Sequence, residues 1–509
     1  MNVQEQLGQL LAEQTTSWHS AIPFTREDAV VAVVRELDRR SGSQDASRPD
    51  IVAGLHMPTL GGNRALQRCL ESTSSDNVSD KSLESWATSL LDSCEQRMSA
   101  EIVLSHCETG FMHLAEDRDG TFDAWIATKQ LPASWRERDD IDWWATWLAR
   151  RFSAASAGSF HAMADISLQM MAYQLPYPQN ARIGGLPIRI WLDILGLLIA
   201  RALEAHDCGE AAPWASQAEL TNDIAHALDM DASAIGGAIA AFTMNRENAA
   251  WHGATPGSAA APLIGIGGDR LVLSHHGLTT EPLFFLLREL RRRDPEDYHN
   301  AAQFREAAFR QDLYACFADK RFVTSENRLR LRRDAGNLRT DIDAAIFDRK
   351  TGTLGIFELK SQDPVARSAA ALERQRENLL YANRQVGGIL DWVKRNGANE
   401  IVKRIDPRLT KTFRAHKIYP FVLGRYLVPA GNGAQPDPRA AWGTWPGLLR
   451  LLDERPIGTR DTNPIASLHA RLANAPGPVH PQAPGREVHT GEIRIRVHPS
   501  WASLQVKSE

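Results

Sequence analysis

Two short runs of β-forming residues, joined by a polar turn, are the feature that most constrains how this chain can fold. The first run covers residues 340–347, the second covers residues 354–362, and Gly352 lies in the turn between them. Alternating runs separated by a glycine-containing turn predict a β-hairpin. If the hairpin is symmetric about its turn, Asp343 lies directly opposite Glu358.

The two predicted strands carry the residue types of a hydrolytic site. Because side chains alternate along a strand, Glu358, Lys360 and Gln362 share one face, and Asp341 and Asp343 share a face of the neighbouring strand. Two facing carboxylates repel each other unless a cation lies between them, and Mg²⁺ binds to one or two carboxylates together with water and phosphate oxygens. Lys360 is placed to orient or deprotonate an attacking water, or to offset charge on a phosphate. The pattern predicts phosphodiester hydrolysis.

These residues resemble the signature of the PD-(D/E)xK nuclease superfamily, which has the restriction-endonuclease-like fold. The signature is an acidic residue on one strand and Glu-x-Lys at the end of the next, here Asp343 and Glu358-Leu359-Lys360, with Gln362 completing a Glu-x-Lys-x-Gln variant. The resemblance implies metal binding by Asp343, Glu358 and the Leu359 carbonyl, with Lys360 as the catalytic base. It also implies that the cofactor is Mg²⁺, for which Mn²⁺ substitutes.

The sequence leaves the first acidic residue of this signature open. Thr340 stands where the proline that gives the superfamily its name would precede Asp341, so either Asp341 or Asp343 can be the metal ligand. The superfamily often lacks that proline.

The predicted helix before the hairpin, at about 302–317, adds a further acidic candidate. Its apolar stripe includes Phe309 and Leu313, and Glu306 falls in the middle of that stripe. A carboxylate that faces a core needs a partner, and in the superfamily the first helix often supplies a glutamate to the site. Glu306 is therefore a candidate, with Glu326 on the first strand as its substitute. The alternative is a glutamate at the edge of the stripe that pairs with an arginine.

A long helix is predicted after the hairpin, from about Val365 to Arg395, and it carries one polar residue on its buried side. Apolar residues recur every seven positions, with Ala382 and Ile389 in a companion row that also contains Gln375. A buried amide requires hydrogen bonds, so Gln375 is a candidate for orienting the site, and an ordinary core glutamine is the alternative.

The charge of the chain is distributed unevenly. Residues 301–430 contain 25 Lys and Arg residues against 15 Asp and Glu residues, a balance of +10, whereas the whole chain has a net charge of −4. A basic module attracts phosphate backbones. A cluster of arginines beside the proposed site forms the predicted nucleic-acid-binding set, with a solvated strand face as the alternative: Arg328, Arg330, Arg332, Arg333 and Arg339.

The rest of the chain reads as supporting regions. Residues 1–250 are predicted to be a mainly α-helical regulatory or partner-binding region, 251–300 a hairpin and helix connector, and 431–509 a Gly- and Pro-rich extension with a possible edge strand. The acidic N-terminal region favours a protein partner or self-association. The apolar run 187–206 is interrupted by charges, which excludes a membrane span.

Cysteine usage and the N-terminus predict a cytoplasmic location. The five cysteines are scattered without a Cys-x-x-Cys pair, and the first residues lack the basic and apolar regions of a signal peptide. No P-loop motif, His-Glu-x-x-His or Gly-x-Ser-x-Gly is present.

The fold class that follows is an α/β nuclease core with the element order αβββαβ at 301–430, preceded by a large mainly α-helical region. The predicted function is a Mg²⁺-dependent nuclease that acts on DNA, with a role in defence against foreign DNA suggested by the superfamily alone. One alternative is a catalytically silent nuclease fold that serves as a DNA-binding or assembly module, and another is an RNA-directed nuclease. Sequence specificity, trigger and oligomeric state are not encoded in any motif found here.

Overall fold

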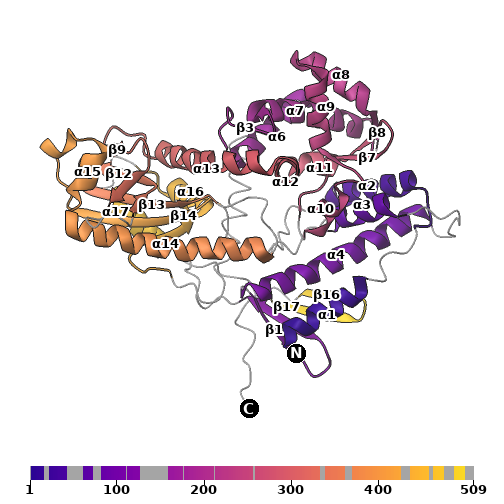
Figure 1. Ribbon diagram of the computed structural model, residues 1–509, viewed down its shortest axis with the longest axis horizontal. Coiled ribbons are helices and arrows are strands. Elements are labelled where there is room, and N and C mark those ends of the chain that lie inside the picture. The colour runs from indigo at the N-terminus through magenta and orange to yellow at the C-terminus, as the bar shows by residue number, and fades with distance from the viewer. Residues whose placement is uncertain are drawn as a thin grey trace.

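The structure is a computed structural model of the 509-residue chain. It describes residues 2–15, 22–42, 61–72, 82–110, 112–126, 159–175, 177–210, 212–255, 258–332, 339–361, 369–425, 436–457, 462–474 and 486–498. Figure 1 shows a largely helical part of the molecule and a part built on a central sheet, with helix α13 (Pro295–Ala315) running between them.

The sheet of the second part contains the predicted hairpin at its centre. Its five strands lie in the order β15-β14-β13-β12-β9. Their bounds are β9 (Phe322–Thr324), β12 (Ala344–Asp348), β13 (Thr353–Lys360), β14 (Lys417–Gly424) and β15 (Ala441–Thr444). The β12–β13 and β9–β12 pairs are antiparallel, and the β13–β14 and β14–β15 pairs are parallel.

The hairpin has the predicted register. Phe347 pairs with Leu354 and Ala345 with Ile356, and this register continued by one step puts Asp343 opposite Glu358. In the turn, Gly352 has a φ of +65°, and a Cβ there would lie 2.5 Å from the Arg414 carbonyl oxygen. Glycine is therefore required at this position both by its backbone conformation and by the close approach of another segment.

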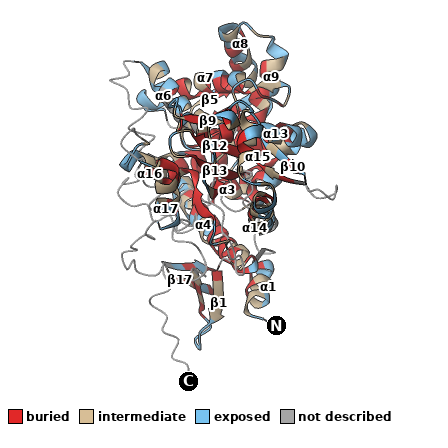
Figure 2. Cartoon of the chain, turned by 90° about the vertical axis from the view of Figure 1, so that its left-hand side faces the viewer, coloured by how far each residue is buried: buried red, intermediate tan, exposed pale blue. Residues whose placement is uncertain are grey.

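Both faces of the hairpin are covered, which explains its continuous apolar composition (Figure 2). On one face, Ile346 and Phe357 pack in a core with Phe309 and Leu313 of α13 and with residues of helices α16 (Trp445–Glu454) and α17 (Pro464–Ala473).

On the other face, Phe347 and Ile356 pack in a second core. That core includes Ile389 and Trp392 of the long helix, and residues of α15. The covering elements are α14 (Ala369–Asn396), α15 (Asn399–Ile405) and the short 3₁₀ helix Leu409–Lys411. Since parallel strands need a crossover connection, α14 and α15 supply the one from β13 to β14.

A separate two-stranded ribbon stands beside the sheet. It consists of β10 (Leu329–Arg332) and β11 (Arg339–Ile342), which pair antiparallel. The chain bends at Asp343 as it leaves β11 and enters β12, so the predicted single strand over 340–347 is two strands with a bend between them.

The helical part has two cores. The first core joins residues of α6 (Phe160–Gln174), α7 (Ile188–Asp207), α8 (Gln217–Leu228), α9 (Ala232–Ala241), α11 (His275–Thr279) and α12 (Pro282–Arg293). The second joins α2 (Arg26–Gly42), α3 (Gly62–Glu71), α10 (Ala249–Ala254) and the start of α4 (Leu83–Glu108). Both cores take residues from a four-stranded sheet, whose strands lie in the order β5 (Trp214–Ser216), β8 (Arg270–Leu273), β7 (Leu263–Gly267), β6 (Thr243–Met244). Two further strands, β3 (Arg182–Ile183) and β4 (Leu186–Pro187), pair only with each other.

A further sheet brings the C-terminal strands of the described chain beside residues 112–126. Its order is β1 (Met112–Glu116), β2 (Phe122–Ile126), β17 (Ile493–His498), β16 (Arg486–Thr490), and it packs against α1 (Val3–Thr15) and α4. The predicted C-terminal strand therefore exists, but it is internal: β17 pairs with β2 on one side and β16 on the other.

The sequence-based boundaries fall inside helices and inside a shared core of the structure. Residue 250 lies inside α10 and residue 300 lies inside α13. The end of the predicted module at residue 430 separates β14 from β15, α16 and α17, although all of them share one core. These boundaries were placed at changes of composition, and the packing continues across those changes. Among the described helices, none is long and apolar enough to cross a membrane.

A buried ion pair fastens the turn end of the hairpin and provides a test of this fold. Asp348 is 0% exposed, and its carboxylate accepts hydrogen bonds from Arg321 Nε and Nη2, each at 2.6 Å. We expect Asp348→Ala to remove the carboxylate that neutralises Arg321 and to destabilise the sheet by about 3–5 kcal/mol. The melting temperature of this part should fall by roughly 6–20 °C. Glu400→Ala, which removes an exposed partner of Lys403, is the control and should cost less than about 1 kcal/mol. Equal losses of stability in the two variants would contradict the role of the Asp348–Arg321 ion pair in holding the sheet together.

Candidate active site

The bend at the start of β12 and the end of β13 bring the two predicted acids together. Asp343 is 6% exposed and Glu358 is 2% exposed. Asp343 Oδ2 accepts a hydrogen bond of 2.8 Å from the backbone N–H of Leu359, next to Glu358. Burial and the neighbouring Glu358 carboxylate raise the pKa of Asp343 to about 7. The cross-strand pair predicted from the register is thus a close, buried carboxyl pair.

The predicted lysine completes this cluster from the same strand. Lys360 Nζ donates a hydrogen bond of 2.6 Å to Glu358 Oε1. Burial raises the pKa of Glu358, and the neighbouring Lys360 ammonium reduces that rise. The other oxygen of the same carboxylate, Glu358 Oε2, is buried and accepts no hydrogen bond from an amine, amide or hydroxyl group of the described residues, and the carboxyl group of Asp343 is its acidic neighbour. A buried carboxylate oxygen without a donor is a position that a proton or a cation would satisfy.

Helix α13 adds Glu306 to the cluster, as the apolar stripe predicted. Burial and the negative charge of Asp343 raise the pKa of Glu306 to about 7. Arg310, one turn further along the helix, donates a hydrogen bond of 3.0 Å to Glu306 Oε1 and also donates to the backbone carbonyl of Asp343. The sequence offered two interpretations of Glu306, a site residue or a glutamate paired with an arginine. Both features are present, since Glu306 lies beside Asp343 and pairs with Arg310. Its substitute, Glu326, is exposed.

The structure separates the two aspartates that the sequence left as alternatives. Asp341 lies in β11 opposite Arg330, and one of its carboxylate oxygens is 3.8 Å from Arg328 Nη1. Asp343, at the bend, is the one that lies beside Glu358.

Among the described side chains, the amide that contacts the site is that of Gln385. Gln385 Oε1 accepts a hydrogen bond of 2.9 Å from Lys360 Nζ. Gln375 lies ten residues earlier on α14, about 15 Å along the helix axis, and its side chain lies outside the described residues. The sequence did contain a signal for Gln385, since it stands three residues after Ala382 and four before Ile389 on the buried face.

Sequence reasoning also missed an exposed aromatic ring near the lysine. Tyr381, one turn before Gln385 on α14, is 49% exposed, and its ring centroid is 5.5 Å from Lys360 Nζ. Arg384 lies over the same ring at 5.4 Å. No periodicity argument could single out Tyr381, because it lies on the polar side of the helix. The last residue of the predicted signature, Gln362, lies outside the described residues.

The predicted arginine cluster is partly described. Three of its members are exposed and alternate with buried or half-buried residues of β10: Arg328, Arg330 and Arg332. Arg333 and the side chain of Arg339 lie outside the described residues. The described arginines form a solvated strand face. Such a face agrees with a nucleic-acid-binding surface and equally with an ordinary solvated strand, so it does not separate these two interpretations.

The oxygen atoms at the end of the hairpin fit a hard divalent cation. In an extended strand the N–H and C=O of one residue point to the same side, so the Leu359 carbonyl faces the side of Asp343. Asp343, Glu358 and this carbonyl make a set of oxygen donors, and Mg²⁺ completes such a set with water. No group of three or more His, Cys, Asp and Glu side chains is placed to hold a metal within the described ranges. The fit therefore depends on two carboxylates and a main-chain oxygen.

Comparisons of the chain with protein-family models, with curated proteins and with solved structures find no match. The resemblance to the PD-(D/E)xK superfamily and the restriction-endonuclease-like fold class therefore stay predictions that rest on the residues and geometry given above.

The raised pKa of Asp343 gives a testable dependence of stability on pH. Between the ordinary pKa of 3.8 and about 7, the folded protein retains a proton that the unfolded chain releases, so raising the pH through this range destabilises the fold. We expect the metal-free protein to melt at a lower temperature at pH 8 than at pH 5. Asp343→Asn cannot ionise and should reduce that difference, as measured by calorimetry in EDTA.

The control for this measurement is Asp406→Asn, which removes a half-buried carboxylate that pairs with Arg408 outside the cluster. It should leave the difference in melting temperature between the two pH values nearly unchanged. A difference that Asp343→Asn does not alter would show that Asp343 does not hold its proton in the folded protein.

Proposed function

We propose that this protein is a metal-dependent nuclease that hydrolyses phosphodiester bonds of DNA. The observation that carries the proposal is the cluster of Asp343, Glu358 and Lys360 at one end of the hairpin, in which two buried carboxyl groups lie next to each other beside an ammonium group. Asp343, Glu358 and the Leu359 carbonyl would hold Mg²⁺, or Mn²⁺ in its place. A bound ion would act there as a Lewis acid toward the phosphate.

The protein side chains have separate parts in this proposal. Lys360 Nζ is held between Glu358 Oε1 and Gln385 Oε1, at 2.6 and 2.9 Å, so its position is fixed from two sides. A positioned ammonium can stabilise negative charge that develops on a phosphate, or exchange a proton with the attacking water. Glu306 carries a pKa of about 7, a value suited to proton transfer near neutral pH.

The substrate and the biological setting are proposed from the charge and the organisation of the chain, and not from the geometry of the site. The net charge of +10 over residues 301–430 and the exposed arginines of β10 favour a nucleic acid. The large helical part would bind a protein partner or a second copy of the chain, and a role in defence against foreign DNA agrees with such an organisation. The proposed location is the cytoplasm.

The central experiment is a metal titration of nuclease activity. We expect the purified protein to cleave plasmid DNA with Mg²⁺ or Mn²⁺ and to be inactive in EDTA. Glu358→Gln should lower the cleavage rate by about 10³-fold, since a metal ion contributes several kcal/mol to the transition state. Lys360→Ala should lower it by about 10²–10⁴-fold. Glu400→Gln, at an exposed carboxylate far from the cluster in sequence, is the matched control and should keep full activity.

The choice of substrates separates this proposal from its alternatives. Plasmid, single-stranded DNA and total RNA are compared under the same conditions. Cleavage of RNA alone would assign an RNA-directed nuclease. Metal-independent DNA binding without cleavage of any substrate would assign a catalytically silent DNA-binding or assembly module and overturn the proposal.

The glutamine contact gives a second prediction with an internal control. Gln385→Ala removes the acceptor that holds Lys360 Nζ, and we expect a roughly 10–100-fold lower cleavage rate, as for other residues that orient a catalytic group. Asn378→Ala, at an exposed position of the same helix, should lower the rate less than about threefold. Gln385→Glu, which retains an acceptor, should recover part of the activity. The reverse order of the two alanine variants would contradict the role of Gln385.

A further inference from the structure

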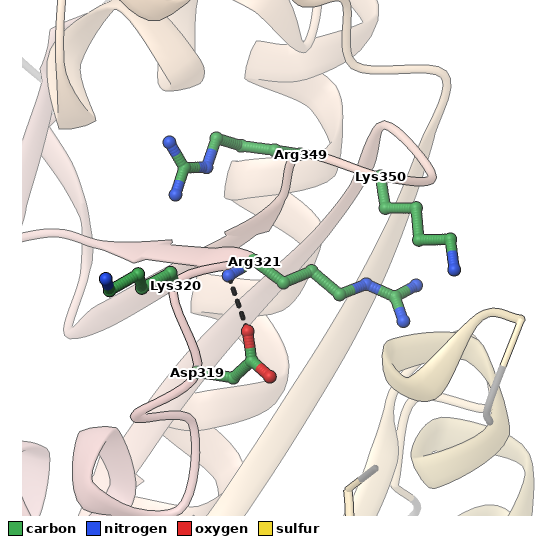
Figure 3. Close-up of a pocket in the computed structure, with 5 residues that line it drawn as sticks. All are labelled: Asp319, Lys320, Arg321, Arg349 and Lys350. Atoms are coloured by element: carbon green, nitrogen blue, oxygen red, sulfur yellow. Dashed lines mark hydrogen bonds between the residues drawn. The ribbon is translucent and has the colours of Figure 1, made fainter. Parts of the chain in front are cut away.

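The turn end of the hairpin, opposite to the acidic cluster, carries a basic pocket (Figure 3). Its cavity has a volume of about 430 Å³. The lining residues come from the segment before β9 and from the β12–β13 turn: Asp319, Lys320, Arg321, Arg349 and Lys350. Four cations and one carboxylate give this lining a formal charge of +3. None of these residues belongs to the arginine cluster that the sequence analysis singled out.

Two of the lining residues, Asp319 and Arg321, make hydrogen bonds that hold the surrounding structure together. Asp319 accepts a hydrogen bond of 2.8 Å from the backbone N–H of Arg321, which Figure 3 marks as a dashed line. Arg321 is paired with the buried Asp348 and also donates to the Thr462 carbonyl. The pocket is therefore built on a rigid base, and its free charge comes from the remaining three cations.

Those three cations, Lys320, Arg349 and Lys350, form no ion pair with any residue in the described part of the chain. Lys320 and Lys350 are exposed and Arg349 is half-buried. Unpaired cations around one cavity repel each other and attract an anion. In Figure 3 the Arg349 and Lys350 side chains extend in different directions from the turn, so the charges are spread rather than focused on one point. Spread charges suit an extended polyanion better than a single phosphate group.

The position of the pocket relative to the acidic cluster agrees with such a ligand. Thr353, next to the turn, and Glu358 are five residues apart on β13, which is about 17 Å in an extended strand. A DNA duplex rises 3.4 Å per base pair, so about five base pairs span the same length. One duplex could thus contact both ends of the hairpin.

We propose that this basic pocket is a binding site for the phosphate backbone of DNA, remote from the site of cleavage. The inference rests on the proposed function for the identity of the polyanion, but not for the existence of the site. Its contacts are electrostatic, and it would hold the substrate without reading its sequence.

The test measures DNA binding without cleavage. The full-length protein carrying Glu358→Gln is titrated in EDTA with a fluorescent 30-base-pair duplex over a range of salt concentrations. Adding Lys320→Gln, Arg349→Gln and Lys350→Gln should weaken binding at least about tenfold. It should also reduce the slope of log K against log salt by about 2.7, because three phosphate contacts are lost. Arg321 is left in place, so that the buried pair with Asp348 is preserved and the fold is retained, as checked by the melting temperature.

The matched control removes the same charge elsewhere in this part of the molecule. Lys394→Gln, Arg395→Gln and Lys403→Gln neutralise three exposed cations on α14 and α15 and should change the slope by less than 1. Equal losses from the two triple variants would show that only net charge matters, and would overturn the site. Tight ATP binding that depends on the pocket cations, with duplex binding unchanged, would overturn it in favour of a compact polyphosphate. Absence of duplex binding in both proteins would also overturn it.

The outcomes distinguish this inference from the proposed function. Pocket-dependent duplex binding by a protein that cleaves nothing with Mg²⁺ would support the pocket and reject the nuclease. Metal-dependent cleavage with unchanged duplex binding in the pocket variant would support the nuclease and reject the pocket.

Discussion

The register of the β12–β13 hairpin is the constraint on which the rest of this structure depends. A shift of one residue would move every side chain of β13 to the opposite face, including Glu358 and Lys360. Such a shift is prevented because both faces are buried in different cores, one under α13, α16 and α17 and the other under α14 and α15. The turn adds to this, because Gly352 has no room for a side chain and Asp348 is tied to Arg321.

The acidic cluster is held together by the fold against its own repulsion. The pKa values of Asp343, Glu358 and Glu306 are all raised, mainly by burial, which means that folding places these groups where ionisation is unfavourable. Lys360 and Arg310 offset part of this cost through direct hydrogen bonds. Proteins commonly carry such an arrangement at functional sites and gain the necessary stability elsewhere, here in the apolar layers above and below the sheet.

Helix α13 connects this cluster to the helical part of the molecule. Tyr298 and Ala301 pack in the core of the helical part, while Phe309 and Leu313 pack on the sheet. Glu306 lies between these two sets, with Arg305 beside it over the rings of Tyr177 and Tyr298. A change in the helical part that tilts or shifts α13 would therefore move a carboxyl group of the cluster. Helix α13 is thus packed in both parts of the molecule and carries one carboxyl group of the cluster.

The sequence by itself determined the local features: the hairpin, its register, the facing acids Asp343 and Glu358, the lysine beside them and the inward-facing Glu306. Each follows from a short-range period of two or 3.6 residues, which the chain carries without reference to its partners. Only the tertiary structure shows that Asp343, at the bend between β11 and β12, lies beside Glu358, while Asp341 pairs with Arg328. It also placed Gln385 beside Lys360, since the depth at which a helix passes a strand end is not encoded in its period. The basic pocket and the cores that continue across the predicted boundaries are likewise formed by segments that are distant in the chain. Local sequence patterns carry no information about which distant segments pack together.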